Sequence, residues 1–201
     1  MFLAVPWAPA SFGKRTSQIA EHLDLMPTLL SLCGLQLPPA EVKAAPLAGQ
    51  DLSPLLSDPA ASLTKTWALS QFPRCHNKDA DNKADYPWSG ECLQGPAAIR
   101  TDIPYMGYTL RTDEYRYTEW AAWNGLQLAP DWDNITIGEQ TNRELYDHRA
   151  QTCVSAASFD GEDANVVESA DPALVKKLSS MLHKIVAEQR TPQRSDEGGG
   201  T

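Results

Sequence analysis

The chain has 201 residues, of which 42% are hydrophobic and 21% charged, and its formal net charge is -9. This length suits one domain or parts of two, and the composition is that of a globular protein rather than a fibrous or disordered one. The acidic balance excludes general binding to nucleic acid or anionic membranes, because both attract proteins of net positive charge. No apolar run approaches the ~20 residues that cross a bilayer, so we expect no membrane span.

The N-terminal segment predicts one strand and one helix. Residues 2–5 are apolar and precede two prolines that lack a ladder N–H, which suits a short strand. Residues 24–33, DLMPTLLSLC, predict a buried helix with an apolar stripe, capped by Asp24 and ended by Gly34. At the end of this helix, Cys33 is interpreted as a small buried apolar residue.

A proline-rich connection follows this helix. Five prolines lie between Pro38 and Pro59, and a short helical turn is expected around residues 52–56. Such a connection separates packed units, so we place a boundary near residue 60. The predicted organisation is the end of an α/β domain at residues 1–57, a second domain at residues 60–190 and a disordered polar tail at residues 191–201.

The stretch MGYTLRTDEYRYTEW, residues 106–120, combines strand-forming residues with two arginines. Its alternation predicts a hairpin of strands 105–112 and 115–123, with tyrosine and tryptophan rings packed under a terminal helix. Arg111 and Arg116 either bind a localised anion, because guanidinium groups match sulfate, phosphate or carboxylate oxygens, or tie the hairpin together. We prefer the structural role for both.

Two more strands and a terminal helix complete the second domain. Residues 66–72 alternate as a strand that Pro73 is expected to end, and residues 144–146 predict another strand. A helix begins at Asp171 and Pro172, and its apolar residues recur at helical spacing, so it should lie across one face of the sheet. The predicted fold class is α+β: a small antiparallel sheet packed by a C-terminal helix, preceded by the last strand and helix of an α/β domain.

Arg74 follows the predicted end of a strand, where a rigid scaffold often fixes a site residue. A buried arginine that binds loop carbonyls would give the same sequence, and we weigh the two interpretations equally. The polar stretch from residue 74 to residue 104 is long enough to be either the wall of a site or a flexible insertion. His76 lies close to Arg74 in this stretch, but a solvated side chain is its simpler interpretation.

The remaining candidates for chemistry are few. The four cysteines lack the spacing of a zinc site, and Cys75 and Cys92 either form a disulfide or stay free. Asn134 begins an N-x-S/T sequon in a polar stretch and is a candidate glycosylation site. No glycine-rich phosphate loop, serine elbow or H-E-x-x-H motif is present, so the chain offers no candidate nucleophile and no metal ligand.

Six segments taken together carry a resemblance. In chain order they are DLMPTLLSLCGL, LAGQDLSPLL, ALSQFPR, MGYTLRTDEYRYTEW, ELYDHR and the terminal amphipathic helix. They resemble the C-terminal part of a type I sulfatase, in the alkaline phosphatase superfamily, and most closely its iduronate-2-sulfatase branch. The resemblance implies that residues 1–57 end the N-terminal α/β sulfatase domain, whose catalytic core is missing, and that residues 60–190 are the C-terminal subdomain.

This resemblance also implies a chemistry. Such enzymes hydrolyse sulfate esters with a formylglycine, made from a cysteine in C-x-P-S-R or C-x-A-x-R, beside a bound calcium ion. None of the four cysteines fits this motif. The resemblance therefore implies that formylglycine and calcium belong to the missing N-terminal part, and that this chain alone is inactive. It further implies a sulfated glycan substrate, as in glycosaminoglycan degradation, and a lysosomal, extracellular or periplasmic location.

The resemblance carries one site residue over to this chain. Arg74, in SQFPR, matches an arginine of this branch and is expected to line or support the substrate pocket. Two alternative functions stay open: a non-catalytic glycan-binding or scaffold domain derived from a sulfatase, and a phosphatase or phosphodiesterase of the same superfamily. The loop after Arg74 departs from the family, so the lysine expected there to bind a carboxylate is not assigned to Lys78, Lys83 or Arg100.

Overall fold

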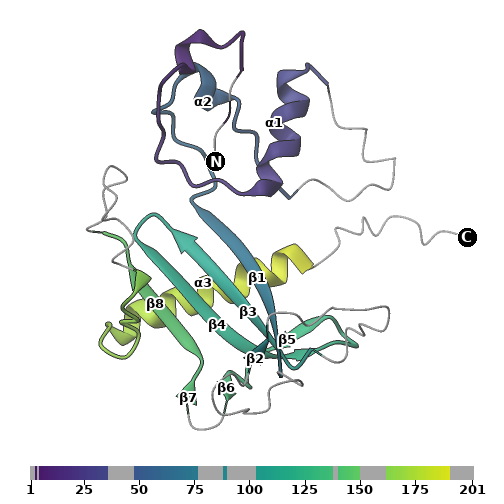
Figure 1. The fold of residues 1–201 in the computed structure, drawn as a ribbon, viewed down its shortest axis with the longest axis vertical. Helices are drawn as coiled ribbons and strands as arrows, with labels where there is room; N and C mark the ends of the chain where they lie inside the picture. Colours follow the sequence, from purple (N-terminus) through teal and green to yellow (C-terminus); the bar gives the residue numbers. More distant parts are fainter. Residues whose placement is uncertain are drawn as a thin grey trace, which may run out of the picture. The chain divides into compact units, whose positions relative to one another are not determined.

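The computed structural model describes residues 3, 5–35, 48–76, 88–89, 103–137, 140–149 and 162–190 (Figure 1). The chain forms two compact units, one of residues 1–68 and 183–201, the other of residues 69–182. None of the helices in the described segments is long and apolar enough to span a bilayer. In chain order the elements are η1 (Pro9–Ser11), η2 (His22–Asp24), α1 (Leu25–Leu32), α2 (Pro54–Ser57), β1 (Trp67–His76), β2 (Trp88–Ser89), β3 (Tyr105–Thr112), β4 (Tyr115–Asn124), β5 (Ala129–Asp131), β6 (Thr136–Ile137), β7 (Gln140–Thr141), β8 (Arg143–Asp147) and α3 (Pro172–Arg190).

Several sequence predictions fall outside the described residues. These are the tail at residues 191–201, the side chains of Cys75 and His76, and most of the loop that contains Cys92, Lys78, Lys83 and Arg100. The predicted strand at residues 2–5 is only partly covered, since residues 2 and 4 are not described. Residues 3 and 5 lie outside any strand, because the carbonyl of Val5 accepts a turn hydrogen bond from the N–H of Ala8 at 3.0 Å.

Helix α1 confirms the predicted helix but is less buried than its sequence indicated. Gly34 ends it with a positive φ of 65°, a conformation that glycine adopts without steric penalty. Within α1 only Thr28 is buried, whereas Met26 is 55% exposed and Leu29 is 50% exposed. Cys33 is also exposed, so its predicted burial is wrong. An apolar helix face needs a second layer to cover it, and the described residues of the first unit contain no sheet that does so.

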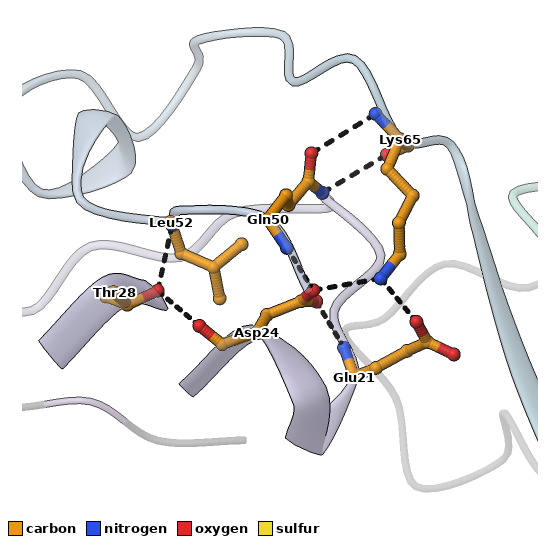
Figure 2. Close-up of polar contacts among 6 residues, drawn as sticks. All are labelled: Glu21, Asp24, Thr28, Gln50, Leu52 and Lys65. Carbon is orange, nitrogen blue, oxygen red and sulfur yellow. Dashed lines mark hydrogen bonds and ion pairs between the residues drawn. The ribbon is translucent and has the colours of Figure 1, made fainter. Parts of the chain in front are cut away.

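The first unit is held together by a buried carboxylate, that of Asp24 (Figure 2). We predicted that Asp24 would cap α1, but its side chain makes no capping bond to that helix. The carboxylate instead accepts hydrogen bonds from the backbone N–H of Glu21 at 2.7 Å and of Gln50 at 2.8 Å. The ammonium of Lys65 lies 2.8 Å from Asp24 Oδ1 and also pairs with Glu21. One buried charge thus joins three separate parts of the sequence.

A second contact runs through Thr28 and repeats this link between α1 and the segment around residue 50 (Figure 2). Its hydroxyl donates to the Asp24 carbonyl at 2.6 Å and accepts from the N–H of Leu52 at 2.9 Å. Gly49 allows the two segments to approach, because a Cβ at this position would lie 2.0 Å from the carbonyl oxygen of Leu23. A side chain at residue 49 would therefore push the segments apart.

The second unit is built on an antiparallel sheet in the strand order β2-β1-β3-β4-β5, with β8 also paired to β4. The predicted hairpin is confirmed: β3 pairs with β4 from Tyr105 opposite Ala122 to Arg111 opposite Arg116. The other edge of β4 is shared, since its first half pairs with β8 and its last residues pair with β5. A separate pair of short strands, β6 and β7, follows β5.

Strand β1 is longer than predicted and runs through Pro73 to His76. Proline is tolerated in a strand when one edge of that strand is open, because its missing N–H then removes no ladder bond. Strand β2 pairs with β1 only at Cys75 and His76, so in the described segments one edge of β1 has no partner beside Pro73. Arg74 therefore lies inside a strand and not beyond its end.

Helix α3 confirms the predicted terminal helix and begins with Pro172, as its sequence indicated. The Asp171 carboxylate caps it by accepting from the N–H of Ala173 at 2.9 Å. A contact between Ser179 and the phenol of Tyr117 places the part of α3 that belongs to the second unit, up to Leu182, on one face of the sheet (Figure 1). The described core residues of this unit are Ile103, Met106, Tyr108, Leu110, Tyr115, Tyr117, Ala121, Ile135, Leu145, Leu178 and Leu182.

The Asp24 carboxylate is expected to carry much of the stability of the first unit. Burial raises its pKa, but Lys65 and the two backbone donors outweigh burial, and the net pKa lies below its usual range. Asp24→Asn leaves Lys65 without this partner and should lower the free energy of unfolding of the first unit by about 3 kcal/mol. Hydrogen exchange of amides in residues 21–33 measures this change.

The pH dependence separates this effect from a general loss of packing. A lowered pKa means that the stabilisation is present above the unfolded pKa, about 3.9, and is lost as the pH falls through the folded value. The difference between wild type and Asp24→Asn should therefore be full at neutral pH and shrink below about pH 4. The exposed Asp133→Asn serves as control, with a change within about 0.5 kcal/mol. A difference that stays constant with pH would contradict the assignment.

Candidate functional site

The sheet of the second unit has two chemically different faces. On β4, Tyr117 and Glu119 point to the face that carries α3, and both are fully buried. Arg116, Thr118 and Trp120 alternate with them and point to the opposite face. We expected Trp120 to pack under the terminal helix. That prediction is wrong, because Trp120 points to the same face as Arg116, away from α3.

On the face away from α3, charged and aromatic side chains contact one another from β1 across to β8. We call this set the arginine–aromatic ladder. Its members come from four different segments, and most of them are half-buried. In order of contact they are Arg74, Trp120, Glu144, Tyr146, Arg116, Glu162 and His148.

One end of the ladder is Arg74 stacked on Trp120. The Cζ atom of the guanidinium lies 4.4 Å from the centre of the indole ring, within the range of a cation–π contact. The ring lies against Gly107 on the neighbouring strand, where an added Cβ would come within 2.6 Å of it. The indole N–H donates to Glu144 Oε1 at 2.8 Å. The ring is therefore held from below by backbone and at its edge by a hydrogen bond.

The other end of the ladder consists of charged and polar side chains that contact one another. Tyr146 donates to Glu144 Oε2 at 3.1 Å, and both burial and the nearby Glu144 raise the pKa of the Tyr146 phenol. Arg116 lies 4.1 Å from the centre of the Tyr146 ring and forms an ion pair of 2.6 Å with Glu162. The buried His148 approaches the second oxygen of Glu162 at 2.9 Å. At this end, therefore, the charge of Arg116 is paired with that of Glu162.

Arg74 differs from the other arginines described in the second unit. No described carboxylate forms an ion pair with it, and the Trp120 ring is the partner that the structure gives it. A half-buried guanidinium of this kind can bind an anion from solution without first breaking an internal pair. In contrast, Arg116 pairs with Glu162, Arg143 with Glu119, and Arg149 with Asp147, while Arg111 donates to the carbonyls of Thr112 and Asp113.

The residues predicted as functional are thus only partly brought together. Arg74 and Arg116 lie at the two ends of the ladder, whereas Arg111 lies at the turn of the hairpin, 2.6 Å from the Thr112 carbonyl. Trp120 and Glu144 were not predicted as site residues. A glycine directly opposite a tryptophan in a predicted hairpin is the signal that indicates Trp120, because the ring then has room to lie flat on the sheet. The roles of Arg74, Arg111 and Arg116 stay predictions.

The face under α3 carries a second polar cluster, which is structural in its geometry. Tyr117 donates to Glu119 at 2.6 Å, and Arg143 approaches the same carboxylate at 3.4 Å. Burial of Tyr117, together with its bond to Glu119, raises the pKa of the phenol well above its usual range. A phenol that stays protonated and a carboxylate with no exposure cannot meet a substrate. This cluster joins β4, β8 and α3.

The described residues contain no group of three or more His, Cys, Asp and Glu side chains that could hold a metal ion. The sequence likewise has no cysteine in a formylglycine motif. The described residues therefore form no calcium site, and no cysteine of the sequence can become a formylglycine through this motif. What the described face can do is bind an anion at Arg74.

Asn134, the candidate glycosylation site, follows β5 in an exposed turn. Its amide nitrogen, the atom that would carry a glycan, donates to Asp131 Oδ2 at 2.6 Å. The backbone carbonyl of Asn134 accepts from the N–H of Ala122 at 2.9 Å, which ties the turn to β4. The side chain is accessible, but its hydrogen bond must break before modification.

The chain is similar in sequence to two iduronate 2-sulfatases. No protein-family model matches the chain. It is 30% identical over 156 residues to iduronate 2-sulfatase of Mus musculus, covering 67% of this chain and 25% of that protein. It is also 30% identical over 141 residues to iduronate 2-sulfatase of Homo sapiens, covering 63% of this chain and 23% of that protein. The chain therefore spans about a quarter of the length of the curated relatives it matches.

One solved structure has a comparable fold. The phosphonate monoester hydrolase of Agrobacterium radiobacter superposes with a TM-score of 0.51 at 16% identity, covering 90% of this chain and 27% of that one. At this identity the match shows a shared fold and nothing about activity. It agrees with the predicted class, a small antiparallel sheet packed by a C-terminal helix in a mixed α/β chain.

The geometry at Asn134 leads to a prediction. Expression through a secretory eukaryotic host is expected to add one N-linked glycan, because the side chain is exposed and begins the sequon. Intact-mass measurement before and after glycosidase treatment detects it, and Asn134→Gln should abolish the difference. Asp131→Ala releases the amide nitrogen and should raise the glycosylated fraction. An unmodified wild-type protein from that host would refute the assignment.

Proposed function

Because this chain belongs to the sulfatase family and corresponds to the C-terminal part of the iduronate 2-sulfatases it matches, we propose that it forms the outer wall of the substrate cleft of a sulfuric ester hydrolase. The proposed substrate is a sulfated glycan that carries a 2-O-sulfated uronic acid, by analogy with the name of those relatives. In this proposal the nucleophile and the calcium ion come from a region outside this chain. The location we propose is the secretory pathway or the periplasm.

The observation that supports this role is the state of Arg74. In an acidic chain, three of the described arginines of the second unit are neutralised by carboxylates, yet Arg74 stacks on an indole and has no such partner in the described segments. A planar guanidinium matches the oxygens of sulfate and carboxylate, and both groups occur on a sulfated uronic acid. We propose that Arg74 binds one of these groups and so orients the sugar in the cleft.

Catalysis and substrate binding are, in this proposal, carried out by different parts of the enzyme. In this proposal a formylglycine and a calcium ion would have to be held by residues outside this chain, where they would supply the nucleophile and stabilise charge on the sulfate oxygens. The contribution of this chain is binding and orientation of the glycan, which lowers the entropic part of the barrier. Arg116 and Arg111 take no direct part, because their guanidinium groups are already bound to Glu162 and to backbone carbonyls.

A direct consequence is that the purified chain should hydrolyse no sulfate ester. The sequence has no formylglycine motif and the described residues form no metal cluster, and the proposal therefore takes both the nucleophile and the Lewis acid from outside this chain. Release of the fluorescent alcohol from an aryl sulfate, measured with and without added calcium, should equal the rate without protein. Turnover that rises with protein concentration and survives repurification would overturn this part of the proposal.

Binding tests the role of Arg74 separately from hydrolysis. Titration calorimetry with a heparin-derived disaccharide that contains a 2-O-sulfated uronic acid should show saturable binding to the wild-type chain. Arg74→Ala should weaken that binding about tenfold or more, since a charge-assisted hydrogen bond contributes about 1.5–3 kcal/mol. Arg149→Ala is the matched control, because Arg149 also lies over an aromatic ring but is already paired with Asp147.

The outcomes of this titration distinguish contact from support. Weaker binding by Arg74→Ala with unchanged thermal unfolding supports contact with the ligand. Loss of thermal stability with unchanged affinity in the remaining folded protein would mean that Arg74 is only a structural residue. An equal loss of affinity in Arg149→Ala would show that the disaccharide responds to net charge and not to this site.

A further inference from the structure

We infer that Trp120 is a positioning residue for Arg74, and that Gly107 and Glu144 hold Trp120 in the orientation this requires. The inference deepens the proposed function and rests on it for the identity of the anion. The arrangement itself rests on three observed contacts: the stacked guanidinium, the ring against the backbone of β3, and the indole N–H bonded to a carboxylate.

Contact with an aromatic ring restricts the motion of an arginine side chain. A free arginine side chain has many rotamers, and most of them point its donors away from any one ligand. When the guanidinium lies over an indole ring, motion out of the ring plane is restricted, while the N–H groups at the edge of the guanidinium stay available. The Arg74 Cζ atom lies over the Trp120 ring, 4.4 Å from its centre, so the guanidinium contacts the face of the ring. Stacking therefore prepares the guanidinium without occupying its donors.

The Trp120 ring is itself fixed by two contacts. Trp120 and Gly107 are directly opposite each other on β4 and β3. A Cβ at residue 107 would approach three atoms of the indole, at 2.6, 2.7 and 2.9 Å, which is closer than real Cβ atoms come. The ring can occupy this place only because residue 107 has no side chain. Its rotation is further limited by the bond of 2.8 Å from Nε1 to Glu144.

The Glu144 carboxylate is held by two hydrogen bonds. This carboxylate bonds to the same indole ring that Arg74 contacts. Both of its oxygens are engaged, one by the Trp120 indole at 2.8 Å and the other by the Tyr146 hydroxyl at 3.1 Å. Glu144 thus anchors the ring while its charge is held by other donors. Neither oxygen of Glu144 forms an ion pair with Arg74 among the described contacts.

A simpler interpretation is that Trp120 only fills space on the sheet. The two interpretations differ in what happens to Arg74 when the ring is removed and the fold is kept. A space-filling tryptophan affects stability, whereas a positioning tryptophan affects the order of the Arg74 guanidinium and the affinity for its anion. Trp123 provides a matched comparison, since it lies on the same strand with its side chain on the opposite face, outside the ladder.

The test uses the full chain and two measurements on each variant. The order of the Arg74 guanidinium is read from the heteronuclear NOE of its 15Nε signal, assigned by its loss in Arg74→Lys. Affinity is read by titration with the same 2-O-sulfated disaccharide and, separately, with inorganic sulfate. Trp120→Leu should reduce the NOE to that of an exposed arginine and weaken disaccharide binding about tenfold, whereas Trp123→Leu should change neither.

Two further variants keep the test decisive if Trp120→Leu fails to fold. Trp120→Phe retains a ring but loses the bond to Glu144, so it should give a smaller loss of order and of affinity. Gly107→Ala leaves every polar group of the ladder unchanged and displaces the ring, so it should act in the same direction as Trp120→Leu. An Arg74 signal as ordered in these folded variants as in the wild type would overturn the inference.

The measurements also separate this inference from the proposed function. If the wild-type chain binds neither probe, yet Trp120→Leu still releases Arg74, the positioning role stands and the proposed anion contact fails. If the wild type binds the disaccharide and Arg74→Ala weakens that binding, but Trp120→Leu leaves both readouts unchanged, the contact stands and the positioning role fails.

Discussion

Strand β4 presents successive side chains to opposite sides of the sheet, and the second unit depends on this alternation. Tyr117 and Glu119 enter the space under α3 and close a buried network with Arg143. Arg116 and Trp120, each one residue away, reach the other side and build the ladder. A shift of one residue in pairing would bury the arginine and expose the carboxylate, so the paired edges of β4 maintain both faces together.

The same chain uses charge in two distinct ways. Asp24 in the first unit, and Glu119 and Glu162 in the second, each accept donors from separate segments and act as internal fasteners. The cationic partners of these carboxylates are Lys65, Arg143 and Arg116. Stacking gives Arg74 an anchor that is not ionic. A positive group such as Arg74 can therefore be partly exposed locally although the net charge of the chain is negative.

Sequence periodicity predicted the parts of the fold whose signals are local. The hairpin, α1, β8 and α3 follow from alternation, helical spacing and caps, and all four are confirmed. The burial of α1 and Cys33 was overestimated, because an apolar stripe shows that a helix needs a cover but not that one is present. Pro73 was taken as the end of a strand, since the sequence does not reveal which strand edges are open. The contact of Arg74 with Trp120 was beyond reach, as it depends on β1 lying beside β3.

The approach of the Trp120 ring to Gly107 has a consequence for how this domain can diverge. Neither position is free to change alone: a methyl group on β3 collides with the indole, and a small residue on β4 leaves a glycine with nothing above it. Related chains that replace the tryptophan would gain packing from an alanine or a β-branched residue at position 107. Positions 107 and 120 should therefore covary across homologues. Homologues with glycine and tryptophan at these positions are expected to keep an arginine over the ring, and the others are not.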